Sequence, residues 1–238
     1  MTKKLIYQGK AKAIFEVEGD DNQVLQVFQD SITAFNNPEK FIFKDKGLIS
    51  CQISTKVFEF LTKNGIKTHL ISSEGDSQIV QKLTILPIEV TVRNYAFGGI
   101  LKKSHFTRGE ELPLSLIEFM YKKDEFGDPL ISEDYVLKYL LKGDEKLFHE
   151  IKTTTSKINQ LLIDFFDKIN IILCDFKIEF GINNKNELLL GDEISCDTCR
   201  LMDKNTRLSL DKDIFRNNEG DVMDGYREVL RRINEQYS

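Results

Sequence analysis

The sequence predicts an α+β fold, because strand-like patterns lead in its first half and helical patterns gather in its second half. Apolar and polar residues alternate in the segments 86–95 and 115–122, as they do in strands with one buried face. In the segments 145–169 and 222–237, apolar residues recur at the spacing of amphipathic helices. These observations favour antiparallel sheets packed against helices.

The N-terminal third is predicted to form strands followed by one helix. "LIYQGKAKAIFEV" has apolar ends around a Gly-Lys-Ala-Lys turn, and "QVLQVFQD" is rich in β-branched and apolar residues. Helical spacing then predicts a helix that ends at Asn64-Gly65. Its apolar positions are Ile49, Ile53, Val57, Phe60 and Leu61. The segments 66–72 and 77–97 return to strand patterns, and in the second of them one face carries Glu89, Thr91 and Arg93.

The rest of the chain is predicted to hold one more strand, two helices, a hairpin and a final helix. "SLIEFMYK" alternates like a strand and is ended by the turn residues of "DEFGDP". Two helices are predicted after Ser132, which is a good N-cap. The second of these helices carries the stripe Leu147, Ile151, Ile158, Leu161, Phe165 and Ile169, and the last helix carries Val222, Tyr226, Val229, Ile233 and Tyr237. A boundary near Leu83–Ile85 divides an N-terminal lobe (1–83) from a C-terminal lobe (84–238).

The segment 170–195, "NIILCDFKIEFGINNKNELLLGDEIS", predicts a hairpin whose strands carry unusual charges. Asn183–Asn186 is a dense turn signal between two apolar runs. With these four residues as the loop, Ile182 faces Glu187 and Lys177 lies opposite Asp192. One face then carries Asp175, Lys177, Glu179 and Asp192, because directly opposed residues share a face. The other face of the first strand carries Ile172, Cys174, Phe176, Ile178 and Phe180.

Carboxylates and a lysine on one face are the groups that a magnesium–nucleotide site requires. Mg²⁺ prefers hard oxygen ligands, and a lysine can neutralise charge on a phosphate or acyl phosphate. A ladder of ion pairs on a solvated strand face would show the same pattern, so that interpretation stays open. Gly9 beside Lys10 and Lys12 favours the nucleotide site, although this turn lacks the spacing of a Walker A loop.

Several segments together resemble the SAICAR synthetase (phosphoribosylaminoimidazole-succinocarboxamide synthase) family. They are "LIYQGKAK" at 5–12, "LPIEVTVRNYAFGG" at 86–99, "DP" at 128–129, "LCDFKIEFG" at 173–181, "GDEISCDTCRLMD" at 191–203 and "DKDIFR" at 211–216. The resemblance covers nearly the whole chain. It implies a two-lobed fold similar to ATP-grasp and kinase-like enzymes, with the nucleotide between the lobes.

The resemblance also implies the activity. ATP and Mg²⁺ would activate the carboxylate of CAIR (5-amino-1-(5-phosphoribosyl)imidazole-4-carboxylate) as an acyl phosphate. The amino group of L-aspartate would then displace phosphate, giving SAICAR, ADP and phosphate in purine biosynthesis. A small-molecule kinase with the same ATP site is the main alternative, and a nucleotide-binding module without turnover is a third. The requirement for aspartate distinguishes the ligase from both.

Individual residue roles follow from the resemblance, position by position. The residues implied to bind ATP are Lys10, Lys12, Gln81, Lys82, Leu83 and Lys122. Glu179 and Asp192 would hold Mg²⁺, and Asp175 and Lys177 would line the reaction centre. The residues implied to bind the anionic substrates are Arg93, Gly98, Gly99, Asp128, Asp197, Arg200, Lys212 and Arg216. A guanidinium suits that task because it can grip a phosphate or carboxylate through two bonds.

The chain departs from the family pattern at two places. Gly99 stands where the family usually has a serine, so a backbone N–H or another residue must replace that hydroxyl. Cys196 and Cys199 stand where the family usually has a proline and a serine. The "CDTC" motif lacks the second ligand pair of a structural zinc site and the βαβ context of a redox motif. We therefore expect these thiols to bind no metal.

The composition limits the possible partners. The 238 residues are 41% hydrophobic and 30% charged, with a formal net charge of −5, which indicates a globular protein. This charge argues against a general nucleic-acid binder but allows a local basic pocket for small anions. The sequence shows no apolar run long enough for a membrane span or a signal peptide, so a cytoplasmic location without membrane partners is expected. A homo-oligomer is also expected.

Overall fold

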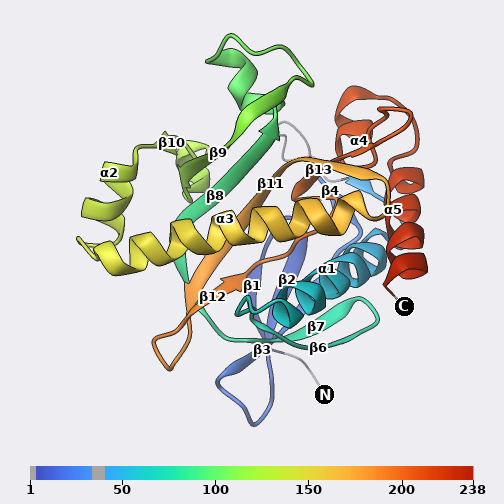
Figure 1. Cartoon of the computed structure of the whole chain (residues 1–238). Helices are drawn as coiled ribbons and strands as arrows, with labels where there is room; N and C mark the ends of the chain where they lie inside the picture. Colours follow the sequence, from blue (N-terminus) through green and yellow to red (C-terminus); the bar gives the residue numbers. More distant parts are fainter. Residues whose placement is uncertain (1–3, 34–40, 238) are drawn as a thin grey trace.

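The structure, a computed structural model, describes residues 4–33 and 41–237, and it arranges them as antiparallel sheets flanked by helices (Figure 1). The first sheet has the strand order β1-β2-β3-β7-β6. Its strands are β1 (Leu5–Gln8), β2 (Lys12–Glu16), β3 (Gln23–Phe28), β6 (Leu70–Glu74) and β7 (Ser77–Gln81). The short strands β4 (Ser31–Ile32) and β5 (Phe41–Ile42) pair with each other before helix α1 (Lys46–Lys63).

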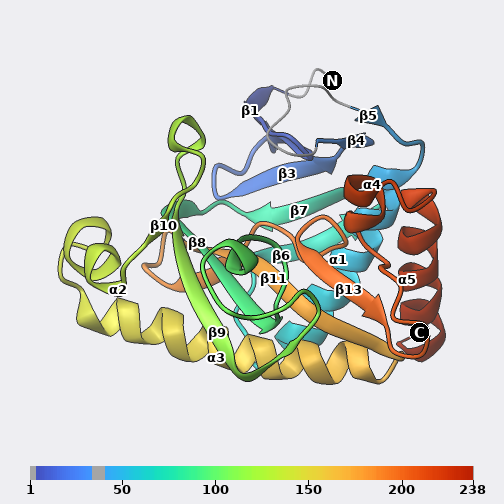
Figure 2. The same ribbon diagram turned by 90° about the horizontal axis from the view of Figure 1, so that it is seen from above.

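The second sheet has the order β10-β9-β8-β11-β12, and β13 also pairs with β11. Its strands are β8 (Thr84–Tyr95), β9 (Glu111–Tyr121), β10 (Leu130–Ile131), β11 (Ile171–Ile182), β12 (Leu188–Gly191) and β13 (Cys199–Asp203). Seen from above, β3 and β7 of the first sheet lie on one side of this sheet and helix α3 lies on the other (Figure 2). The second sheet is therefore the middle layer of the molecule.

The two helices that follow β10 begin at side-chain caps. Helix α2 (Glu133–Tyr135) continues into a π-helical turn (Val136–Leu140), and the Ser132 hydroxyl accepts a hydrogen bond from the Tyr135 amide at 3.1 Å. Asp144 caps α3 (Glu145–Asp167) in the same way, through the Leu147 amide. The other helical segments are 3₁₀ turns at Gly98–Lys102 and Asp124–Phe126, α4 (Asp213–Asn217) and α5 (Val222–Gln236).

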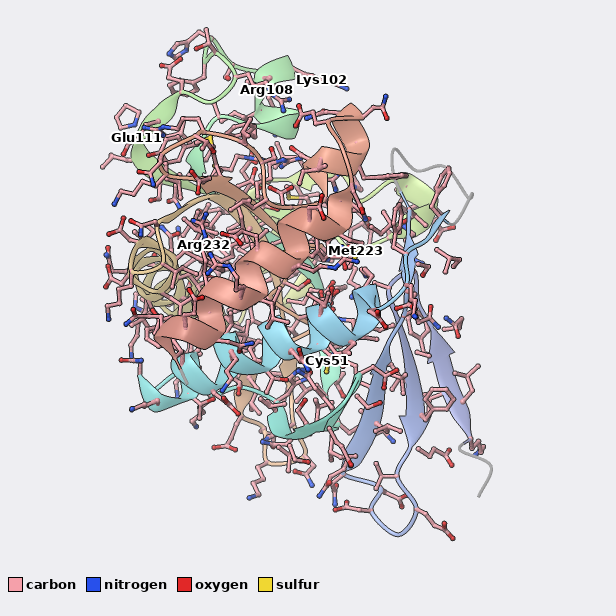
Figure 3. The ribbon with its side chains drawn as sticks, turned by 90° about the vertical axis from the view of Figure 1, so that its right-hand side faces the viewer. Cys51, Lys102, Arg108, Glu111, Met223 and Arg232 are labelled. Atoms are coloured by element: carbon pink, nitrogen blue, oxygen red, sulfur yellow. The ribbon has the colours of Figure 1, made fainter. Side chains whose placement is uncertain are left out.

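One hydrophobic core joins the helices to the second sheet. Val222, Tyr226, Val229 and Ile233 of the predicted α5 stripe are buried in it, whereas Tyr237 lies just beyond α5 and is only partly buried. Helix α1 contributes Ile49, Ile53, Val57, Phe58 and Leu61, and the predicted Phe60 is only partly buried. Helices α1 and α5 lie side by side (Figure 3). Ile169 is also in the core, but it lies beyond the end of α3, so the predicted helical stripe is two residues too long.

The α+β class is confirmed, and most predicted strands and helices lie where the sequence placed them. The predicted register of the 170–195 hairpin is wrong by one residue, because Ile182 pairs with Leu188 rather than Glu187. The loop is longer than predicted: it is closed by a hydrogen bond from the Asn183 amide to the Glu187 carbonyl oxygen. The apolar face of β11 also differs from the prediction. A β-bulge between Leu173 and Asp175 puts Ile171 and Leu173 in the core in place of Ile172 and Cys174.

Candidate active site

Strands β8 and β11 place two rows of charged side chains on one face of the second sheet. Their register sets Arg93 opposite Asp175 and Glu89 opposite Glu179. Lys177 lies between the two acidic residues of β11, two positions from each. Because directly opposed residues share a face, the polar side chains predicted for the two strands form a single surface. The prediction that these charges share one face is correct.

The other edge of β11 is divided between two strands. Residues 171–176 pair with β13, and residues 179–182 pair with β12. Between them the loop 192–198 leaves the sheet, and the Lys177 amide donates a hydrogen bond to the carbonyl oxygen of Thr198 at 2.9 Å. The loop therefore brings its acidic residues beside the middle of the charged row.

Lys177 is the centre of a cluster of carboxylates. Its Nζ lies 2.8 Å from Glu89 Oε2, 3.2 Å from Glu179 Oε1 and 3.5 Å from Asp192 Oδ2. Two further lysines reach the same carboxylates, since Lys12 pairs with Asp192 and Lys122 pairs with Glu179. This carboxylate–lysine cluster consists of Glu89, Glu179, Asp192, Lys12, Lys122 and Lys177.

Mutual attraction outweighs the effect of burial on the pKa values of Lys177 and Asp192. Burial lowers the pKa of Lys177, but Asp192, Glu179 and Glu89 outweigh it and hold that pKa well above its ordinary value. Burial likewise raises the pKa of Asp192, and Lys12 and Lys177 overcome it, so the net shift is downward. Lys177 and Asp192 are therefore opposite charges at neutral pH, as an electrostatic binding site requires.

Backbone geometry explains why Asp192 joins the cluster despite the shifted register. The observed pairing sets Glu179 opposite Gly191, where β12 ends. Asp192 follows in the left-handed region, with φ of 57°. Leaving the sheet in this conformation turns its side chain toward Lys177. The predicted grouping of Lys177 with Asp192 is therefore present, but the loop and not strand pairing produces it.

Two arginines lie at the other end of the charged row on β11, beside Asp175. Asp175 accepts hydrogen bonds from Arg93 Nη1 at 2.9 Å and from Arg200 Nη1 at 2.8 Å. Arg93 Nε also donates to Glu118 at 2.6 Å, and Arg200 Nε donates to Asp213 at 2.8 Å. Each guanidinium is thus held by two carboxylates in one orientation. We call Arg93, Glu118, Asp175, Arg200 and Asp213 the arginine cluster.

Gly98 and Gly99 lie against this cluster. Gly98 has φ of 63°, and a Cβ built on it would lie 3.1 Å from both Arg200 Nη atoms. A side chain at Gly98 would therefore be strained and would crowd the guanidinium. The 3₁₀ turn that begins at Gly98 presents backbone amides beside Arg200, a suitable substitute for the serine hydroxyl that Gly99 lacks.

A third group of charges surrounds Asp197. Its carboxylate pairs with Lys46, which is completely buried at the start of α1. Asp197 Oδ1 accepts a hydrogen bond from the Tyr226 hydroxyl at 3.2 Å and lies 3.8 Å from Lys212 Nζ. Arg216 pairs with Asp213 at 2.6 Å, which connects this region to the arginine cluster.

The predicted nucleotide-binding segment 81–83 connects β7 to β8, and therefore the first sheet to the second. The Gln81 amide donates to the His69 carbonyl oxygen at 2.7 Å, and the Leu83 side chain lies against Gly181. A Cβ at Gly181 would approach Leu83 Cβ to 2.7 Å, so this close packing requires glycine. Lys10 is exposed in the turn between β1 and β2. These placements suit a nucleotide bound where the two sheets meet.

Asp128, predicted to bind substrate, lies in the turn after β9. It has φ of 49° and accepts a hydrogen bond from the Lys123 amide at 2.8 Å. This contact lies within the turn after β9, one residue from Lys122. The contact stabilises the turn that positions Lys122.

Four charged residues at the site were not predicted as functional: Glu118, Lys46 and Glu193, which are buried, and Glu89, which is partly exposed. The alternation of β8 and β9 gave a usable signal for Glu89 and Glu118. Lys46 and Glu193 gave none, because their burial depends on the packing of α1 against distant parts of the chain. Glu193 lies 3.5 Å from Lys12, and burial raises its pKa.

All four cysteines are buried free thiols. Within residues 4–33 and 41–237, no group of three or more His, Cys, Asp and Glu side chains is arranged as a metal site. Glu179 and Asp192 form only a pair, which Mg²⁺ can use because it completes its shell with phosphate and water. Among residues 4–33 and 41–237, no helix is long and apolar enough to cross a membrane.

The fold and the site define an α+β enzyme whose clustered charges suit anionic substrates. The family model for SAICAR synthetase matches residues 5–233. A phosphoribosylaminoimidazole-succinocarboxamide synthase of Wolbachia pipientis is 46% identical over 233 residues, which is 97% of this chain and 96% of that protein. The enzyme of that name from Campylobacter jejuni (strain 81-176) is also 46% identical, over 98% of this chain and 99% of that protein.

Solved structures agree with the sequence relatives. A phosphoribosylaminoimidazole-succinocarboxamide synthase from Ehrlichia chaffeensis has a TM-score of 0.93 and 43% identity, covering 97% of this chain and 98% of that chain. A SAICAR synthetase in complex with ADP has a TM-score of 0.90 and 40% identity, covering 97% of each chain. The chain belongs to the SAICAR synthetase family.

Proposed function

We propose that this protein joins the carboxylate of CAIR to the amino group of L-aspartate, using ATP and releasing SAICAR, ADP and phosphate. The observation that carries the proposal is the arrangement along β11. A cluster suited to metal and phosphate lies at Glu179, and a cluster suited to an anionic substrate lies at Asp175. Family membership and the ADP complex of a relative support the same conclusion.

We propose specific roles for the residues of the two clusters. Lys10, Lys12 and Lys122 bind the phosphates of ATP, and the segment Gln81–Leu83 binds the adenine. The substrate phosphate and carboxylate are bound by Arg93, Arg200 and Arg216 and by the amides at Gly98 and Gly99. Asp197 and Lys212 belong to the neighbouring group of charges and contact the substrates outside these anionic groups. Asp175 orients the two arginines, because it accepts a hydrogen bond from each of them.

Glu179 and Asp192 fit a magnesium ion. Both are carboxylates that reach the same ammonium, Lys177 Nζ, at 3.2 and 3.5 Å, so their oxygens converge on a small volume. When bound there, Mg²⁺ would screen the charge of the phosphates. Lys177 stands between the magnesium residues and Asp175, where it can stabilise negative charge that develops on the transferred phosphoryl group.

The order of events follows from the chemistry of a carboxylate, which is a poor acyl donor. A carboxylate oxygen of CAIR attacks the γ-phosphorus of ATP, and ADP leaves. The amine of aspartate then attacks the carbonyl carbon, and the C–O bond breaks with loss of phosphate. The protein must keep water away from the acyl phosphate, as a closed site between two sheets can do.

Turnover with defined substrates tests the proposal. With ATP, Mg²⁺ and CAIR, little steady ADP formation is expected until L-aspartate is added. Aspartate should then start release of ADP and phosphate in amounts equal to the SAICAR formed. A stable phosphorylated product without aspartate would identify a small-molecule kinase instead. Tight ATP binding without ADP release would identify a nucleotide-binding module.

Three further expectations belong to the proposal. We expect a homo-oligomer, a cytoplasmic location and a division into lobes at residue 83. The position of that division is supported by the change from the first sheet to the second between Gln81 and Thr84. Size-exclusion chromatography with light scattering, and limited proteolysis near Leu83 with and without ADP, test the first and the third.

A further inference from the structure

The second step of the proposed reaction needs a base. At neutral pH the amino group of L-aspartate carries a proton, and an ammonium has no electron pair with which to attack a carbonyl carbon. One proton must therefore move to a protein group before the C–N bond forms. General bases of this kind contribute about 10²- to 10⁴-fold to turnover.

Histidines do not supply this base among residues 4–33 and 41–237. His69 is buried beside Asp192, where burial lowers its pKa to about 3. His105 and His149 are exposed, in the loop after the Gly98–Lys102 turn and on α3.

In the arginine cluster, burial opposes the ionisation of Glu118 and Asp213, but neighbouring cations, including the guanidinium groups, outweigh it and lower both pKa values. Burial raises the pKa of Asp175, but its oxygens already accept hydrogen bonds from Arg93 and Arg200. A different residue type has to be considered.

The buried charges around Asp197 contain two lysines for one carboxylate. Lys46 pairs directly with Asp197 Oδ2, and Ser50 Oγ donates to the same oxygen at 3.5 Å. The Tyr226 hydroxyl donates to Oδ1. Lys212 Nζ is left 3.8 Å from Oδ1, too far for a hydrogen bond. Asp197 therefore stabilises Lys46 strongly and Lys212 weakly.

We propose that Lys212 is the general base that accepts the proton from the amino group of L-aspartate. The proposal rests on the proposed function and deepens it. Lys212 is adjacent to Asp213, which holds both Arg200 and Arg216. Its side chain is only 14% exposed, and it borders the cluster that is proposed to bind the substrate anions.

Burial and two neighbouring cations make Lys212 easier to deprotonate than an ordinary lysine. Burial lowers its pKa; Asp197 opposes this shift, whereas the positive charges of Arg216 and Lys46 add to it. Glu193 opposes the shift more weakly, and the net pKa is below the ordinary value of a lysine. Asp197 is the poorer base, because Lys46 and Lys212 lower its pKa even though burial raises it.

The step balances with the substrates of the ligation alone. Neutral Lys212 takes a proton from the ammonium of aspartate and becomes an ammonium itself. The freed electron pair forms the C–N bond, and the C–O bond to phosphate breaks. Phosphate leaves with the electron pair of that C–O bond and takes the second proton from the nitrogen, which leaves a neutral amide. Lys212 returns its proton to solvent or phosphate before the next cycle.

Two substitutions separate a base from a cation that only binds. Lys212→Arg keeps the positive charge but cannot become neutral in a protein. We expect it to lower kcat at least about 100-fold, with the KM for aspartate changed by less than about threefold. Lys212→Ala should be equally slow, and added methylamine should restore part of its activity in proportion to the free amine. Lys204→Arg, at an exposed lysine after β13, is the matched control and should stay within about twofold of wild type.

Each outcome decides the proposal. Retention of more than about one tenth of wild-type kcat by Lys212→Arg would show that Lys212 only binds the substrate. Absence of amine rescue in Lys212→Ala, with ADP binding intact, would also overturn the base role. If Lys212→Ala does not fold, Lys212→Gln replaces it in the rescue experiment. Failure of wild type to make SAICAR would instead overturn the proposed function.

Discussion

The two ends of β11 hold charges in opposite ways. At the Glu179 end, lysines meet the carboxylates, and their side chains remain partly exposed: 31% for Lys177 and 42% for Lys122. At the Asp175 end, arginines meet the carboxylates, and the Arg93 side chain is only 6% exposed. The carboxylate–lysine cluster is therefore open to solvent and ligand, whereas the centre of the arginine cluster is enclosed.

This difference follows from the shapes of the two cations. A lysine ammonium is a point charge on a flexible stem, so it can move when a metal ion or a phosphate arrives. A guanidinium is a planar fork that binds two oxygens in a fixed direction. The comparison suggests that the lysine end adapts to the changing charge of ATP, while the arginine end holds one anionic substrate in a fixed position.

The largest expected effect on turnover comes from a substitution in the carboxylate–lysine cluster, at the Glu179 end of β11. Glu179→Gln keeps the shape of the side chain but removes a charge that binds a hard cation. Turnover should fall about 10²- to 10³-fold, as for other losses of a charge-stabilising group. The test is kcat as a function of Mg²⁺ concentration, with ADP binding as a check of folding. Glu187→Gln, in the exposed loop of the same hairpin, is the matched control. Near-normal turnover of Glu179→Gln at ordinary magnesium would remove the metal from this end.

The arginine end should respond differently. Arg93→Ala is expected to raise the KM for CAIR about 100-fold and to change the KM for ATP by less than about threefold. It also leaves the buried carboxylates of Glu118 and Asp175 without this partner, so we expect a loss of unfolding free energy of about 3 kcal/mol. Initial rates and urea unfolding measure the two effects. An equal or larger effect on ATP would contradict the division between the two ends.

Asp211 lies beside Asp213 of the arginine cluster, and the pH dependence of the unfolding free energy tests its ionisation. Burial raises its pKa to about 7 from an ordinary value of 3.8, and the negative charge of Asp213 adds to the shift. The folded protein therefore binds this proton more tightly than the unfolded chain, so this contribution is present at low pH and is lost as pH rises toward 7. Unfolding free energy should fall by roughly 2 kcal/mol more in wild type than in Asp211→Asn between pH 5 and pH 7. Equal slopes in urea unfolding would show that Asp211 is ionised throughout.

The smallest effect is expected for the cysteines between the two ends. Cys196 and Cys199 are buried apolar neighbours in the core. A double variant, Cys196→Ala with Cys199→Ser, should fold and keep kcat within about twofold of wild type. Elemental analysis of wild type should find no stoichiometric zinc. One zinc per chain, lost in the variant together with the fold, would make this loop a metal site.

The sequence predicted which side chains share a face of a strand better than it predicted how the strands pair. Alternation was enough to place Glu89 with Arg93 on one face of β8, and Asp175 with Lys177 and Glu179 on one face of β11, because side-chain direction in a strand depends on position. The pairing of β8 with β11, which joins the two faces, was not predicted. The hairpin register depended on the loop length, which four asparagine and lysine residues left ambiguous by one. Asp192 reached the predicted place through its left-handed backbone, and no sequence pattern fixes that conformation.

Lys46 could not have been predicted as part of the site. Its sequence context, at the start of a helix, is typical of an exposed lysine. It is completely buried because α1 packs against α5 and because Asp197, about 150 residues away, supplies the opposite charge. Long-range pairs of this kind are properties of the tertiary structure. Family resemblance located Asp197 but not its partner.

The central claim is that the carboxylate of CAIR receives the phosphoryl group between the two ends of β11. Isotopic labelling tests it most directly. CAIR with oxygen-18 in its carboxylate is incubated with ATP, Mg²⁺ and L-aspartate, and the released phosphate is examined by mass spectrometry. The account predicts one labelled oxygen in each phosphate formed with SAICAR, because the carboxylate oxygen attacks phosphorus and leaves with it. Phosphate without the label, released at the same rate as SAICAR, would contradict the acyl-phosphate route.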